Sequence, residues 1–268
     1  MTSVFELVKD PYERKARVIP GLLVALPLLV PLLCVYGPKH PILTSVMGLL
    51  GGCGAIYALA SVARGRGKKL EEILVKKWGG MPTTIALRHR DNFLDGVSKQ
   101  RYHTAIVDKL GIAMPTALEE ATNPSEADGI YTGATRQLRE LTRSDKHLLL
   151  KENIAYGFHR NMVAMKSVGI FSCALGIIYG LLIAKILEIS PIRFVITRFA
   201  NPGLPAGLTL LISAALLLSW LFYFDKDVVK RMGFVYAERL FECLISLRSL
   251  RKRAVRPASA GREDAGSE

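Results

Sequence analysis

Arginine and histidine side chains gather in two polar stretches of the chain, around residues 88–103 and 143–160. A guanidinium group presents paired N–H donors that match the oxygens of a phosphate, and a protonated histidine adds a further donor. Several such groups converging in one place would bind a nucleotide or another small phosphate-bearing ligand. The residues we expect at this anion site are Arg88, His89, Arg90, Arg101, His103, Arg143, His159 and Arg160.

The same residue types allow two other interpretations. One is a solvated helical surface with internal ion pairs. The other is a metal-dependent nuclease or phosphodiesterase that uses His89, Asp91, His103, Asp108 and His159. The chain has no H-x-x-x-H or H-E-x-x-H spacing, no P-loop and no G-x-S-x-G motif. The enzyme interpretation therefore rests on residue types alone, and we expect no catalytic residue, no metal and no cofactor.

The elements that must position these residues are dominated by four apolar segments. Each is on the order of 20 residues, and a helix of that length rises about 30 Å, the thickness of the hydrocarbon core of a bilayer. The sequence thus predicts four transmembrane helices. They are Val18–Tyr36, Ile42–Ala63, Val168–Leu187 and Leu204–Phe224.

Positive charge predicts the orientation of these helices. All but four of the 36 lysines and arginines fall in residues 1–17, 64–166 and 225–268. Because basic loops stay on the cytoplasmic side, we expect both termini and the central region inside the cell, with short outer loops at Gly37–Pro41 and Glu188–Gly203. This pattern predicts a multi-pass protein of the inner (plasma) membrane and argues against nucleic acid as a partner.

The expected fold is an all-α integral membrane protein with four transmembrane helices, a small helical cytoplasmic insert between the second and third, and a cytoplasmic C-terminal helix. Apolar positions of that last helix repeat at intervals of three and four residues, which predicts packing against the insert or against another copy. The segments are a juxtamembrane helix (1–17), a first transmembrane hairpin (18–63), the insert (64–166), a second hairpin (167–224), a basic amphipathic helix (225–256) and a disordered tail (257–268).

Small residues within the apolar segments predict close helix packing. Gly48 and Gly52 in the second segment, and Gly176 and Gly180 in the third, match the G-x-x-x-G pattern that lets two helix backbones approach closely in lipid. The partner helix belongs either to the same chain or to another copy, and we expect a homo-oligomer. Lys185 is the one ionisable residue in the four segments, which argues against an ion-coupled transporter.

Hydroxyl side chains in the segments have two interpretations. They could line a passive pore if several copies assemble, or they could bond to the preceding turn of their own helix. These residues are Thr44, Ser45, Ser61, Ser172, Thr209, Ser213 and Ser219.

Together the patterns favour a non-enzymatic membrane protein, an oligomeric effector or channel-like protein gated through its cytoplasmic domain. The expected partners are the lipid bilayer, further copies of the chain, and a cytoplasmic protein or small anionic ligand. The alternatives are a membrane scaffold that tethers a cytoplasmic partner, and a membrane-bound hydrolase of phosphodiesters or lipids.

Overall fold

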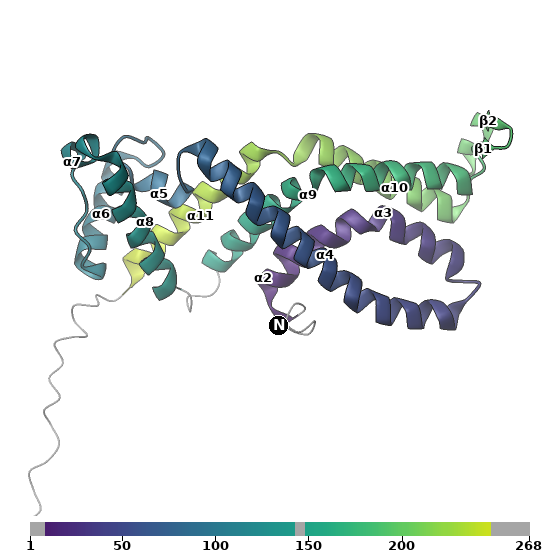
Figure 1. Ribbon diagram of the computed structural model, residues 1–268, viewed down its shortest axis with the longest axis horizontal. Coiled ribbons are helices and arrows are strands. Elements are labelled where there is room, and N and C mark those ends of the chain that lie inside the picture. The colour runs from purple at the N-terminus through teal and green to yellow at the C-terminus, as the bar shows by residue number, and fades with distance from the viewer. Residues whose placement is uncertain (1–8, 143–147, 248–268) are drawn as a thin grey trace, which may run out of the picture. The chain divides into compact units, whose positions relative to one another are not determined.

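The computed structural model describes residues 9–142 and 148–247, which are largely helical (Figure 1). The chain forms two compact units. One comprises Met1–Gly80 and Leu150–Tyr236 and is called here the bundle unit; the other comprises Met81–Leu149 and the chain from Ala237 onward and is called the insert unit. The predicted all-α class is therefore confirmed, with the addition of one short β-hairpin.

The bundle unit contains three helical stretches that are long and apolar enough to cross a membrane, in the part of the chain that was searched. They indicate a multi-pass membrane protein and agree with the first, third and fourth predicted segments. The elements are α2 (Pro11–Glu13), η1 (Arg14–Val18) and α3 (Ile19–Tyr36) in the first, α9 (Leu148–Ile183) in the second, and α10 (Leu204–Leu218) with η3 (Ser219–Tyr223) in the third.

The second predicted segment, Ile42–Ala63, lies inside one continuous helix, α4 (Pro41–Trp78), which packs against α3. Most side chains between residues 42 and 56, including those of Thr44 and the positions around Gly48 and Gly52, lie outside the described part. Membrane crossing by this segment stays a prediction. Helix α4 ends at Trp78 because Gly79 takes a left-handed backbone conformation with φ of 77°, which costs glycine little.

The expected outer loop Glu188–Gly203 is more ordered than the sequence analysis predicted. Helix α9 ends at Ile183, four residues before the predicted limit, and an antiparallel hairpin follows, formed by β1 (Leu187–Ile189) and β2 (Ile192–Phe194). A short 3-10 helix, η2 (Ile196–Ala200), comes next. Glu188 lies opposite Arg193 in the hairpin, so a cross-strand pair of opposite charges replaces the irregular loop.

The insert unit is a small group of helices, and three of them begin at a side-chain cap. It contains α5 (Pro82–Leu87), α6 (Gly96–Leu110), α7 (Ala117–Thr122) and α8 (Pro124–Leu141), together with the last turns of α11 (Lys226–Ser246). Asp95, Thr116 and Asn123 accept backbone N–H groups at the starts of α6, α7 and α8. The short helix α5 is buried along its whole length.

The apolar stripe of α11 packs within its own chain. In the bundle unit Val229 joins a core cluster with Leu74 and Tyr156. In the insert unit the ring of Phe241 lies 5.4 Å from that of Tyr102, and Lys109 donates to the Leu244 carbonyl at 2.9 Å. Of the two packing partners that the sequence allowed, the structure shows the intramolecular one.

Candidate functional site

The eight residues predicted to bind an anion do not form one cluster. Four of them gather in the insert unit: Arg88, His89 and Arg90 directly follow α5, and His103 lies on α6. Arg101 lies on the exposed face of α6. His159 and Arg160 lie on α9 in the bundle unit, and Arg143 lies outside the described residues.

Arg88 and Arg90 already have carboxylate partners in the insert unit. Arg88 forms a two-pronged pair with Asp128, from Nε to Oδ1 and from Nη2 to Oδ2, each at 2.7 Å. Arg90 donates from Nη1 to Glu120 at 2.9 Å and from Nη2 to Asp128 at 3.1 Å. These contacts favour the interpretation of internal ion pairs; anion binding by these residues stays a prediction.

Glu120 is the centre of this network. Its side chain is 2% exposed and accepts four hydrogen bonds, from the N–H groups of His89 (2.7 Å) and Arg90 (3.2 Å), from the Arg90 guanidinium (2.9 Å) and from the Tyr131 hydroxyl (2.6 Å). Burial opposes ionisation, but the hydrogen bonds from Tyr131, His89 and Arg90 outweigh it and hold the pKa of Glu120 below its ordinary value. The network joins the segment after α5 to α7 and α8.

The two histidines of this region bond to backbone carbonyls. His89 Nε2 lies 3.0 Å from the Pro115 oxygen, and His103 Nε2 lies 2.8 Å from the Leu87 oxygen. Their rings meet edge to face at 4.8 Å. Burial lowers the pKa of His103, so it is neutral at physiological pH. Within the described residues no three His, Cys, Asp or Glu side chains converge as a metal site would require.

These pKa shifts predict that the insert unit loses stability in acid. His103 and Glu120 both have folded pKa values below their unfolded values of 6.5 and 4.5, so each binds fewer protons when folded. Their contributions are complete above pH 6.5 and are lost as the pH falls, first that of His103 and then that of Glu120. The protection factors of amides in the insert unit, which correct for the slower intrinsic exchange in acid, should fall below about pH 6.5. His103→Gln keeps a donor for the Leu87 carbonyl but does not titrate, so it should remove the part of the pH dependence that lies near pH 6.5. A pH profile identical to that of wild type would contradict the assignment to His103.

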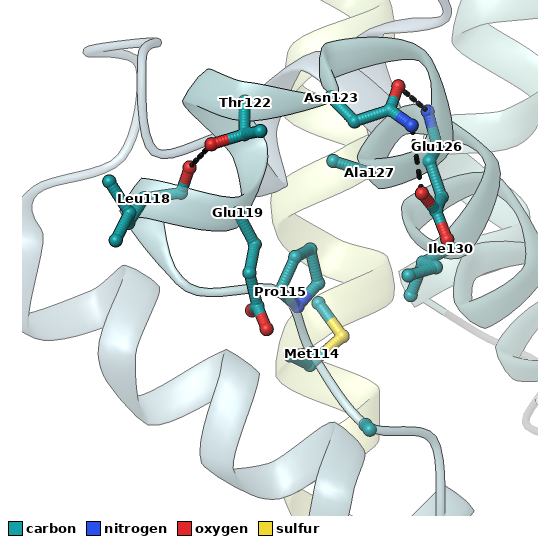
Figure 2. A pocket seen from close by; sticks show the side chains of 10 residues that line it. Met114, Pro115, Leu118, Glu119, Thr122, Asn123, Glu126, Ala127 and Ile130 are labelled. Atoms are coloured by element: carbon teal, nitrogen blue, oxygen red, sulfur yellow. Dashed lines mark hydrogen bonds between the residues drawn. The ribbon is translucent and has the colours of Figure 1, made fainter.

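A cavity lies beside the network on the α7–α8 side (Figure 2). Its volume is about 470 Å³, and the floor and walls come from the loop before α7 and from the first turns of α7 and α8. The sequence analysis missed this cavity. The available signal was a run without lysine or arginine at residues 110–135, in a chain that has 36 such residues. The lining residues are Ala113, Met114, Pro115, Leu118, Glu119, Thr122, Asn123, Glu126, Ala127 and Ile130.

Of the two predicted residues in the bundle unit, Arg160 takes part in a second polar network and His159 does not. Arg160 donates to Glu71 of α4 at 2.9 Å, and the Tyr156 hydroxyl donates to the same carboxylate at 2.8 Å. The fully buried Asn161 donates to the Ala16 carbonyl of η1. These bonds join η1, α4 and α9. His159 lies among aromatic rings, with the Tyr223 ring at 5.8 Å and that of Phe224 at 6.0 Å.

The contact between α9 and α10 is formed by glycines and hydroxyls. A Cβ atom placed on Gly176 would lie 2.4 Å from Ser213 Oγ and 2.9 Å from the Pro27 carbonyl of α3, and one placed on Gly180 would lie 2.9 Å from Leu210. The glycines predicted to pack closely in the third segment thus lie at contacts within the chain. We call this contact the α9–α10 seam; it includes Gly169, Ser172, Gly176, Gly180, Thr209, Ser213 and Trp220.

Three buried polar atoms of the seam have no hydrogen-bond partner among the described atoms. They are Ser172 Oγ, Ser213 Oγ and Trp220 Nε1, and their residues are 4%, 0% and 0% exposed. Thr209 and Ser219 instead bond to carbonyls of their own helix. The residues expected to line a pore between copies are therefore divided: Ser172, Thr209 and Ser213 face the interior of a single chain.

Comparison with protein-family models, with curated proteins and with solved structures finds no match to this chain. A function must therefore be argued from the geometry of these residues.

Proposed function

We propose that this chain is a non-enzymatic, multi-pass membrane protein that changes the permeability of its membrane under the control of the insert unit. In this proposal Ile42–Ala63 is a fourth span, and both ends and the insert lie in the cytoplasm. Support comes from the continuity of α4 and from the basic residues, of which all but four lie outside the spans and the two outer loops.

The observation that carries the proposal is the set of unpartnered polar atoms in the α9–α10 seam. A buried hydroxyl without a partner costs on the order of 1–3 kcal/mol, and lipid offers no compensating hydrogen bond. A helix that only anchors a protein needs no such groups. Ser172 and Ser213 would gain partners if water entered the seam, so the hydroxyls favour a second, hydrated arrangement of these helices.

The outer faces of the spans are too apolar to line an aqueous path, which favours a path along the seam. Large apolar side chains cover them, among them Leu33, Phe171, Leu211 and Phe222, which are 56% or more exposed. A pore lined only by these outer faces would be apolar. We therefore propose that several copies assemble and that the seam of each copy opens toward a shared path. 

Control by the insert unit would pass through the long helices. Helices α4 and α9 have 38 and 36 residues, so each rises about 55 Å, well beyond a hydrocarbon core of about 30 Å. Each must continue outside the bilayer, where Glu71 and Arg160 join the two. Because α9 carries both Arg160 and the seam residue Gly176, a displacement of its outer part would act directly on the seam.

Liposome leakage tests this proposal. Gly176→Ala should hold the seam apart, because the new Cβ would overlap Ser213 Oγ and the Pro27 carbonyl, and we expect it to raise the leak of a small ion several-fold over wild type. Gly54→Ala on α4 is the matched control, since its Cβ would meet no described atom within 4 Å. Ser213→Ala should reduce the leak, whereas Ser219→Ala, at an exposed hydroxyl bonded within its own helix, should not.

Two further results would contradict the proposal. One is correctly folded protein that never leaks in any variant; a stable cytoplasmic partner in pull-downs would then favour the scaffold, and metal-dependent turnover abolished by His89→Ala or His103→Ala would favour the hydrolase. The other is a strictly monomeric mass in detergent, because four helices alone leave no room for an aqueous path.

A further inference from the structure

The cavity of the insert unit carries carboxylates that no basic side chain of the network neutralises. Residues 110–135 contain four acidic residues and no lysine or arginine. Glu120 and Asp128 pair with Arg88 and Arg90, as described above. The other two, Glu119 and Glu126, line the cavity. In a chain of net charge +13, this cavity is a local acidic site.

Both carboxylates are held in place by their own helix starts. Glu119 accepts hydrogen bonds from the N–H and hydroxyl groups of Thr116, at 2.7 and 2.9 Å, and these bonds lower the pKa of Glu119. Glu126 accepts from the side-chain amide of Asn123 at 2.9 Å, a bond drawn in Figure 2. The two groups are therefore fixed in position, which reduces the ordering cost of binding a cation.

Between the carboxylates the cavity wall is apolar. Met114, Pro115, Ala127 and Ile130 form it, and Leu118, which is 77% exposed, extends the apolar surface beyond the rim. A volume of about 470 Å³ accommodates one long side chain and part of its neighbour. The combination suits a cationic head on an apolar stem, with a second apolar group resting on Leu118.

We propose that this cavity binds a lysine or arginine side chain of a partner polypeptide, with an apolar residue beside it in the partner sequence. The ligand class is thus a cation, although the arginines nearby had predicted an anion. The exposed Leu118 favours a polypeptide over a small free cation, because only the former brings an apolar neighbour. This binding does not depend on the proposed change in permeability, and it can be measured without any leak assay.

The test is direct binding to the full chain in a nonionic detergent, with acetyl-Leu-Lys-Leu-amide as the probe. We expect the Glu119→Gln, Glu126→Gln double variant to bind about three- to tenfold more weakly, the range for loss of two exposed charge pairs. Glutamine at both positions keeps an acceptor for Thr116 and Asn123, so the helix caps persist. Glu140→Gln, on the exposed face of α8 away from the cavity, is the matched control and should bind as wild type does.

Three outcomes would overturn the proposal. If acetyl-Leu-Gln-Leu-amide bound as tightly as the lysine peptide, the carboxylates would not be recognising the positive charge. Equal loss in the Glu140→Gln variant would show a general electrostatic effect. Spermidine binding as tightly as the peptide, with the same dependence on Glu119 and Glu126, would assign the cavity to a free polyamine instead of a polypeptide.

Discussion

Glu120→Ala is expected to lower the free energy of unfolding of the insert unit by about 2–4 kcal/mol, the cost of leaving two hydrogen-bond donors without their acceptor. The carboxylate is 2% exposed and accepts four hydrogen bonds from three residues. Alanine would leave the Tyr131 hydroxyl and the N–H of His89 buried without an acceptor. The segment between α5 and α6 would then lose its bonds to Glu120 of α7, while Arg88 and Arg90 would keep their pairs with Asp128 of α8. Hydrogen exchange of peptides covering 81–142 in the full-length protein would measure this loss.

Two variants separate this effect from a general loss of charge. Glu120→Gln keeps one acceptor oxygen but removes the charge opposite Arg90, so we expect a smaller loss, about 1–3 kcal/mol. Glu140→Ala removes an exposed carboxylate from α8 and should change stability by less than about 0.5 kcal/mol. If Glu120→Ala lost no more stability than Glu140→Ala, the network would not hold the insert unit together.

The spans could be predicted because their signal is local. Apolar runs of about 20 residues are unusual outside membranes. The structure has helices at all four predicted segments, and at three of them the helix is long and apolar enough to cross a membrane. The hairpin at Leu187–Phe194 was missed because its strands are only three residues long. An alternation that short does not distinguish a strand from a loop.

The sequence predicted the basic residues of the candidate site but not their carboxylate partners, because the partners are distant in the sequence. Arg90 and Glu120 are 30 positions apart, and Arg88 and Asp128 are 40 apart. The sequence shows which residues are basic but not which carboxylates fold against them, so arginines committed to ion pairs resemble an anion site. The sequence also does not predict which way the hydroxyl side chains face. The positions of Ser172 and Ser213 along the chain do not reveal that both are buried inside a single copy.

Gly67→Ala is expected to disrupt the network that joins η1, α4 and α9. A Cβ atom at Gly67 would lie 1.8 Å from Asn161 Oδ1 and 3.3 Å from Arg160 Nε. Neither side chain is free to move away, because Asn161 donates to the Ala16 carbonyl and Arg160 pairs with Glu71. We expect a loss of about 1–3 kcal/mol from this overpacking, although alanine favours the helix over glycine by about 1 kcal/mol.

Gly65→Ala provides the matched control two residues earlier on α4. Its Cβ would meet no described atom within 4 Å, so the helix preference of alanine acts alone and should stabilise the protein by up to about 1 kcal/mol. The free energies of unfolding of the two alanine variants should therefore differ by about 2–4 kcal/mol, with Gly67→Ala below wild type and Gly65→Ala above it. The midpoints of thermal unfolding, compared in one detergent, would show this difference. Equal midpoints would show that α4 and α9 do not meet at Gly67. If the network also transmits control from the insert unit, Gly67→Ala should change liposome leakage as well, and Gly65→Ala should leave it at the wild-type level.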